Sequence, residues 1–465
     1  MTNSSLRSRL TELFNLRREE ILPVLLAGFF FFCVLTALMM LRPARDALGM
    51  QRGIESVRWL FMGTALMTLL ANPVFGWLVS RLPRLQFIAA TYVFFALCLV
   101  GFYLLMVLAP DAIGIASGQV FYVWFSVFNL FAIMLFWALM ADRFSLEQSK
   151  RFFALIAVGG TLGAIFGPWL ASVLAQPLGT PALLLVSASL LIIALIPARA
   201  VARSQASTQG ASSDHPPDRQ NQSVIGGGAW QGVKAVFQSS YLFGIAGYVI
   251  MMSIMATLLY FTRLQMVAAL GDGVDMRASM FARIDMITQV ATLILQAVLT
   301  GKLMKRFGVH VTLMLLPLTV ALGFVGLAIV GTLAVLIAFE AAFRAIQRAV
   351  TRPARETLYT VLGREDKYKS KAFIDTFAYR GGDVLGAQLE GLLGRLGTGL
   401  ASLAGAAIPL ALTWAALGLW LGRAQQQRAG PAPTPADAGP PVDSMQRAAG
   451  RTSAADTSST ARSPS

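Results

Sequence analysis

The sequence predicts an all-α polytopic membrane protein whose twelve transmembrane helices form two six-helix pseudo-repeats. Three observations lead to this fold class. Apolar residues make up 56% of the 465 positions and charged residues only 13%, a balance that soluble domains do not show. Apolar stretches of membrane length recur along the whole chain. Two short motifs of the first half also return in the second half at nearly the same offset.

Twelve apolar runs are long enough to cross a hydrocarbon core of about 30 Å, which takes about 20 helical residues. They begin near Ile21, Val57, Phe87, Ile113, Phe152 and Ala182 in the first half, and near Tyr241, Met280, Val311, Thr332, Phe373 and Ala401 in the second. We expect one membrane-spanning helix from each run.

Polar segments divide the chain between and around these runs. Residues 199–229 are rich in Ser, Gln, Asp and Pro, as linkers are, and Trp230, Val233, Val236 and Phe237 then recur at helical spacing, as in an interfacial amphipathic helix. The tail is rich in Ala, Pro, Ser and Thr, which favours disorder. The expected segments are an N-terminus (1–20), a first half (21–198), a linker with an amphipathic helix (199–238), a second half (239–421) and a disordered tail (422–465).

Lys and Arg are concentrated in the connections after the even-numbered spans, as at Arg84, Lys150 and Lys302, whereas most of the opposite connections have almost none. By the positive-inside rule both termini, the linker and the tail lie in the cytoplasm, and we expect the inner membrane of a bacterium as the location. The formal charge of +15 is thereby explained without a nucleic-acid partner. The expected partners are the lipid bilayer and a small solute, and the expected state is a monomer.

The two halves carry matching motifs. The pattern Gly76-Trp-Leu-Val-Ser-Arg81 returns as Gly301-Lys-Leu-Met-Lys-Arg306, 225 positions later, and Gly159-Gly160 with Gly163 returns as Gly381-Gly382 with Gly386, 222 positions later. Such internal symmetry predicts a six-plus-six architecture with a site between the halves. The glycine spacing predicts close helix packing. The Gly-x-Leu-x-x-Arg pattern resembles the loop motif of the major facilitator superfamily, whose fold this resemblance implies.

Charged residues inside the spans are the main functional signal. Arg-Pro-Ala-Arg followed by an acid occurs at Arg42–Asp46 and at Arg352–Glu356, and charges at such depth are costly and mark the paths of polar substrates. In the tenth span Arg344, Arg348, Arg352 and Arg355 fall within about 80° on a helix of 100° per residue. This spacing predicts a basic stripe, which Pro353 is expected to kink near its lower end.

Arginine outnumbers acid within the spans, and its planar fork suits phosphate and carboxylate groups, so the sequence predicts an anionic substrate. The candidate substrate-binding residues are Arg42, Arg45, Arg344, Arg348, Arg352, Arg355 and Arg380. The candidate residues for charge pairing or proton coupling are Asp46, Asp285, Glu340, Glu356, Asp375 and Asp383. A structural alternative is that the lower arginines snorkel to headgroups and the upper ones form a packing network.

Several longer segments resemble the nucleotide exchange transporters, which include the ATP/ADP translocases of plastids and of obligate intracellular bacteria. The segments are Leu41–Gly49, Phe136–Asp142, Glu147–Arg151, Gly228–Gly232, Arg352–Glu356, Lys367–Asp375 and Tyr379–Asp383. The resemblance runs from about residue 20 to 421. It implies an alternating-access exchanger of a nucleotide or other phosphorylated metabolite.

The resemblance also implies roles for individual positions. Two lysines of that family that matter for transport correspond to Arg45 and Arg355, which keep the positive charge. Two glutamates of the family, in its fourth and seventh spans, correspond to Phe125 or Ser126 and to Thr257, so neither carboxylate is kept.

Three other classes of protein are alternatives to an anion exchanger. A proton-coupled carrier of a different anion would use Asp285, Asp375 or Asp383 as its titrating carboxylate. A carrier fold without transport would serve as a sensor or assembly protein. An enzyme is not expected, and neither is a cofactor or metal, because His215 and His310 are the only histidines and the sequence shows no metal-ligand spacing or nucleophile constellation.

Overall fold

The computed structural model describes residues 18–81, 84–204, 229–271, 273–299, 303–363, 370–371, 373–396 and 400–429, and helices account for nearly all of them. Most of the predicted linker, residues 430–465 of the predicted tail and Lys302 lie outside this part of the chain. The predicted boundaries at 198 and 421 fall inside helices, which continue to Ser204 and Ala429.

The first half holds seven helical elements. They are α2 (Arg18–Gly49), the 3-10 turn η1 (Met50–Arg52), α3 (Ile54–Arg81), α4 (Arg84–Leu108), α5 (Ala112–Arg143), α6 (Leu146–Leu178) and α7 (Ala182–Ser204).

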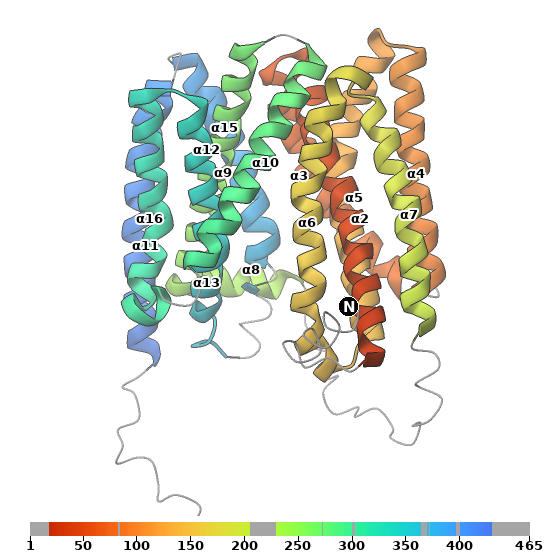
Figure 1. The fold of residues 1–465 in the computed structure, drawn as a ribbon. Helices are drawn as coiled ribbons and strands as arrows, with labels where there is room; N and C mark the ends of the chain where they lie inside the picture. The colour runs from red at the N-terminus through yellow and green to blue at the C-terminus, as the bar shows by residue number, and fades with distance from the viewer. Residues whose placement is uncertain are drawn as a thin grey trace, which may run out of the picture.

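The second half begins with the short helix α8, which lies across the lower end of the molecule (Figure 1). Its elements are α8 (Ala229–Gln238), α9 (Ser240–Leu270), α10 (Val274–Leu299), α11 (Leu303–Val330), α12 (Leu333–Ile346), η4 (Gln347–Thr351), α13 (Arg352–Leu358), η5 (Ile374–Ala378), α15 (Tyr379–Leu396) and α16 (Leu400–Ala429).

Within the described residues, ten helices are long and apolar enough to cross a membrane. The other two predicted spans, the tenth and the eleventh, are the helical runs Leu333–Leu358 and Ile374–Leu396. The first of these has 26 residues and a length of about 39 Å at 1.5 Å per residue, so length does not set it apart. Each of these two runs contains a π-helical turn, which distinguishes them from the described parts of the ten apolar spans.

Glycines let the first and fifth helices of each half approach closely. On α6, a Cβ added to Gly163 would lie 2.5 Å from the backbone oxygen of Phe32, and one added to Gly167 would lie 2.7 Å from that of Thr36. On α15, a Cβ on Gly382 would lie 2.8 Å from the backbone oxygen of Ile250 in α9. The close packing predicted from the glycine spacing is confirmed, and it recurs at matching places in the two halves.

The two halves form side-by-side bundles, and each has its own apolar core (Figure 1). One core includes Phe30, Tyr92 and Phe136, and the other includes Tyr248, Phe339 and Trp414. A third cluster contains residues from both halves.

That third cluster joins the halves toward one end of the molecule. It includes Ala44 and Ala47 near the end of α2, Phe261 and Leu264 near the end of α9, and Phe281 near the start of α10. The end of α2, the end of α9 and the start of α10 lie at the upper end in Figure 1, opposite the start of α2 and the end of α16. The bundles are therefore sealed together at the end remote from the start of α2, which we call the closed end.

We expect Gly163→Ala to destabilise the protein by about 1–3 kcal/mol, because the added methyl group must push α6 away from α2. Thermal unfolding of the purified variant measures this loss. Gly101→Ala on α4 is the matched control, since nothing lies within 4 Å of a Cβ at that position. Equal unfolding midpoints for the two variants would contradict the packing argument.

Candidate functional site

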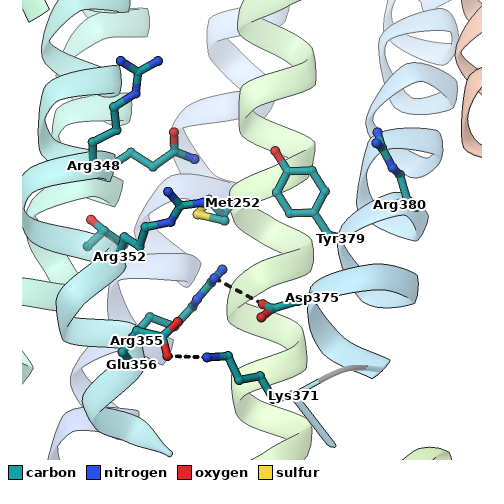
Figure 2. A pocket seen from close by; sticks show the side chains of 11 residues that line it. Met252, Arg348, Arg352, Arg355, Glu356, Lys371, Asp375, Tyr379 and Arg380 are labelled. Carbon is teal, nitrogen blue, oxygen red and sulfur yellow. Dashed lines mark hydrogen bonds and ion pairs between the residues drawn. The ribbon is translucent and has the colours of Figure 1, made fainter. Parts of the chain in front are cut away.

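A cavity of about 510 Å³ lies in the second half, between the two charged helical runs. Figure 2 shows arginines of the tenth span reaching in from one side and residues of the eleventh span from the other. The lining residues are Met252, Gln347, Arg348, Thr351, Arg352, Arg355, Glu356, Lys371, Asp375, Tyr379 and Arg380. This volume lies within the range of about 300–1,000 Å³ that small-molecule sites occupy.

Both walls of the cavity contain a π-helical turn, η4 in the tenth span and η5 in the eleventh. The first ends at Thr351, two residues before Pro353. Proline has no N–H to donate to the carbonyl oxygen four residues earlier, and a wider turn accommodates that missing bond. We expected Pro353 to kink the helix, and the structure has a π-helical turn just before it, a feature that is frequent at functional sites.

Some cations of the cavity have acidic partners. A guanidinium nitrogen of Arg355 lies 3.2 Å from a carboxylate oxygen of Asp375, and the ammonium of Lys371 contacts Glu356 at 2.5 Å (Figure 2). Arg380 lies 3.1 Å from Asp383 on the next turn of the same helix.

Arg348 and Arg352 differ from these paired cations. Both side chains are exposed to the cavity, and within the described residues neither has a carboxylate at ion-pair distance. Arg348 also lies within electrostatic range of Arg42 and Arg344. The cavity therefore holds a surplus of positive charge.

A second group of charges, the inter-half network, lies closer to the closed end and is centred on Arg263 of α9. This arginine is fully buried. Its guanidinium lies 2.8 Å from Asp285, 3.7 Å from Glu340 and 4.0 Å from Asp46. Because Asp46 belongs to the first half and the other residues to the second, the network crosses between the bundles.

Three further arginines complete the inter-half network. Arg344 lies 2.9 Å from Glu340, Arg42 lies 4.0 Å from Asp285, and Arg45 pairs with the neighbouring Asp46.

Two tyrosines enclose the pair formed by Arg45 and Asp46. The Tyr260 hydroxyl donates a hydrogen bond of 2.8 Å to Asp46, and Arg45 lies over the Tyr122 ring at 4.6 Å. Charges and rings from α2, α5, α9, α10 and α12 thus hold one another in place.

A second set of polar contacts ties the halves together at the closed end itself. Arg58 of α3 donates to Glu390 of α15 at 2.8 Å, and Gln265 of α9 donates to the same carboxylate at 2.7 Å. The backbone N–H of Thr180 donates to Asp275 of α10 at 2.6 Å. A Cβ at Gly391 would lie 3.0 Å from the Arg58 side chain, so this glycine leaves room for the guanidinium.

The structure sorts the sequence-predicted residues into these two groups. Arg348, Arg352, Arg355, Arg380, Glu356 and Asp375 line the cavity, Asp383 pairs with Arg380 behind it, and Arg42, Arg45, Asp46, Asp285, Glu340 and Arg344 belong to the inter-half network. Sequence reasoning did not select Arg263, Tyr122 or Tyr260. Arg263 did carry a signal, since it follows the seventh span on the side where positive charge is rare.

We expect Arg263→Met to cost about 3–5 kcal/mol, because it leaves Asp46, Asp285 and Glu340 without the cation they share. Adding Asp285→Asn should recover part of this loss by removing one stranded carboxylate. Thermal unfolding of both variants tests this, with Arg283→Met at an exposed position of α10 as the control. Wild-type stability of Arg263→Met would show that the network does not hold the closed end.

Similarity to known proteins bears on the family and the fold of this chain. A family model described as the Major Facilitator Superfamily matches residues 24–354. A search of curated proteins found no match.

Solved structures with a similar fold include a point mutant of the nucleoside transporter NupG, with a TM-score of 0.59 and 12% identity over 87% of this chain and 99% of that one. A bacterial homolog of the human lysosomal transporter Spinster, in an inward-facing and unoccupied conformation, gives a TM-score of 0.56 and 12% identity over 90% of this chain and 100% of that one. The family match covers most of the chain, and the structural likeness agrees with the helical arrangement. The chain belongs to the major facilitator superfamily and is a membrane transport protein.

Proposed function

We propose that the protein transports an organic anion by alternating access, and that the anion is a nucleotide or another phosphorylated metabolite. The observation that carries this proposal is that Arg348 and Arg352, which have no carboxylate partner among the described residues, line a cavity among membrane-spanning helices. Both side chains are exposed to the cavity, but closing the cavity around them would bury two charges without a partner, which is strongly unfavourable. An anion with several negative oxygens would supply the missing partner, and arginine forks bind such groups through paired hydrogen bonds.

The remaining lining residues fit an organic anion better than a simple inorganic ion. Met252, Thr351 and Tyr379 offer apolar, hydroxyl and aromatic contacts in the same cavity. Arg355 and Arg380 would join the anion by exchanging their acidic partners, Asp375 and Asp383, for it. This gives the acids the role of holding the arginines while the site is empty.

The inter-half network has a different role in this proposal. Arg42, Arg45 and Arg344 hold the closed end shut through Asp46, Asp285 and Glu340. Arg42 is 31% exposed and stands within electrostatic range of Arg348, so a bound anion would compete with these acids for it. Such competition would link occupancy of the cavity to opening of the closed end.

The charge of the cavity favours exchange as the mode of transport. We call the end opposite the closed end the open end. Closing it over an empty cavity would bury Arg348 and Arg352 without a counter-charge, which costs several kcal/mol for each ion. Closing it over an anion avoids that cost. The loaded carrier should therefore reorient more readily than the empty one, so that one anion leaves when another returns.

The charge distribution also suggests which side the cavity faces. The positive-inside rule puts both termini in the cytoplasm of a bacterium, and the start of α2 lies at the end opposite the closed one (Figure 1). On this assignment the cavity opens to the cytoplasm and the inter-half network lies toward the outer side of the inner membrane. The arrangement needs only one copy of the chain.

We expect ATP, ADP or another phosphorylated metabolite to raise the unfolding temperature, because a ligand that binds only the folded state stabilises it. Arg352→Ala and Arg355→Ala should each weaken binding about 10- to 100-fold through the loss of charged hydrogen bonds. Lys234→Ala, which removes an exposed charge on α8, is the control. If no anion in a panel of nucleotides, sugar phosphates and dicarboxylates gave a shift, a non-transporting role would be favoured.

We expect uptake of the anion so identified to be faster into liposomes preloaded with unlabelled anion than into empty liposomes. The physical reason is the cost of reorienting the empty, positively charged cavity. Radiolabel uptake by the reconstituted protein measures the difference. Equal rates into loaded and empty liposomes would argue against obligatory exchange.

A further inference from the structure

Asp285, Asp375 and Asp383 are the three carboxylates that a proton-coupled carrier would use, and their surroundings differ. Asp285 lies near three arginines, Arg263 at 2.8 Å, Arg344 at 3.5 Å and Arg42 at 4.0 Å. So much positive charge keeps this carboxylate ionised. Asp375 pairs with Arg355, but its side chain is 34% exposed, so water solvates it as well.

Asp383 is the third carboxylate, and it combines burial with one cationic partner within the part of the chain that the structure describes. Its side chain is 12% exposed, and that partner is Arg380 at 3.1 Å. Arg380 itself lines the cavity and is 30% exposed. The positive charge that stabilises the Asp383 carboxylate therefore belongs to a side chain, Arg380, that an anion in the cavity can attract.

Among the described residues, the other polar groups near Asp383 are neutral hydroxyls. From α9, Ser253 lies 2.5 Å from one carboxylate oxygen, and Thr257 also reaches the carboxylate. Tyr379 stands on its own helical run, and Tyr122 of the first half is within electrostatic range. On α3, which also packs against α15, Arg58 is engaged with Glu390, two turns further along α15. The helix α16 makes few contacts with α15.

The hydrogen bonds of Ser253 are compatible with a proton on the Asp383 carboxylate. Its hydroxyl oxygen lies 2.5 Å from Asp383 and 2.9 Å from the backbone oxygen of Tyr379, and both are acceptors when Asp383 is ionised. A hydroxyl has one hydrogen to donate but can accept as well. If Asp383 carries a proton, it can donate to Ser253, and Ser253 can donate to Tyr379, so both short contacts become hydrogen bonds.

We propose that Asp383 binds a proton when an anion in the cavity draws Arg380 away from it, so that the carrier moves a proton together with its anion. The proton comes from water on the side where the anion enters, attaches to a carboxylate oxygen of Asp383, and returns to water when the anion leaves and Arg380 pairs with Asp383 again. This inference rests on the proposed anion site. It predicts tighter anion binding as the pH falls, since each ligand promotes binding of the other.

The first test needs no anion, because Arg380→Gln imitates the withdrawal of the arginine. Infrared spectroscopy distinguishes the C=O stretch of a protonated carboxyl group from the bands of a carboxylate. We expect the protonated band at neutral pH in Arg380→Gln, and not in wild type, in Arg380→Lys or in the double variant Arg380→Gln with Asp383→Asn. Arg355→Gln is the matched control, since it removes the cation beside Asp375, whose side chain is more exposed than that of Asp383, and we expect no protonated band from it.

Absence of the band in Arg380→Gln, or its persistence in the double variant, would overturn the proposal.

The second test adds pyrophosphate to the wild-type protein, which remains available even if Arg380→Gln does not fold. Binding accompanied by the protonated band, and loss of that band in Asp383→Asn, is the expected result. Binding without the band overturns the proton site, whereas no binding of pyrophosphate counts against the anion site and leaves the first test to decide on Asp383.

Discussion

The cost of an unpaired positive charge among membrane-spanning helices is the constraint on which the rest of this structure depends. For Arg263 three acids offset this cost, and the arginine becomes a fixed part of the inter-half network. Arg348 and Arg352 have no acidic partner among the described residues to offset this cost, and they face a cavity. The same residue type therefore serves in one place to hold the bundles together and in another to attract a solute. Arg380 is intermediate, since its one partner, Asp383, can release it.

The packing of the helices lets this charge pattern control a movement of the whole protein. Within each half, glycines bring the first and fifth helices into backbone contact, so each bundle can move as a rigid body. Between the halves, apolar packing and ion pairs are concentrated at the closed end. When the two halves rock about such a joint, one end of the carrier closes while the other opens. An anion that competes for arginines of the network would change the balance between the two conformations.

Much of the fold was predictable from the sequence, because apolar run length and internal repeats report directly on membrane helices. The basic stripe of the tenth span was predictable too, since four arginines recur at helical spacing. The pairing of the arginines was not predictable, because Arg263 comes close to Asp46 only after helices from both halves have packed. The turns η4 and η5 were also missed, since a fixed 100° per residue assumes regular α-helix. Glu390 gave no signal, because its partner Arg58 lies 332 positions away in the chain.

The most direct test of the account is the distance across the open end in the absence of any polyvalent anion. Spin labels at Glu147→Cys on α6 and Thr360→Cys after α13, with Cys33 and Cys98 replaced, would report it by pulsed electron resonance. The account predicts one long distance for the wild-type cavity, and an added shorter population when Arg348→Gln and Arg352→Gln remove the unpaired charges. Identical distance distributions in the two proteins would show that these arginines do not hold the empty carrier open.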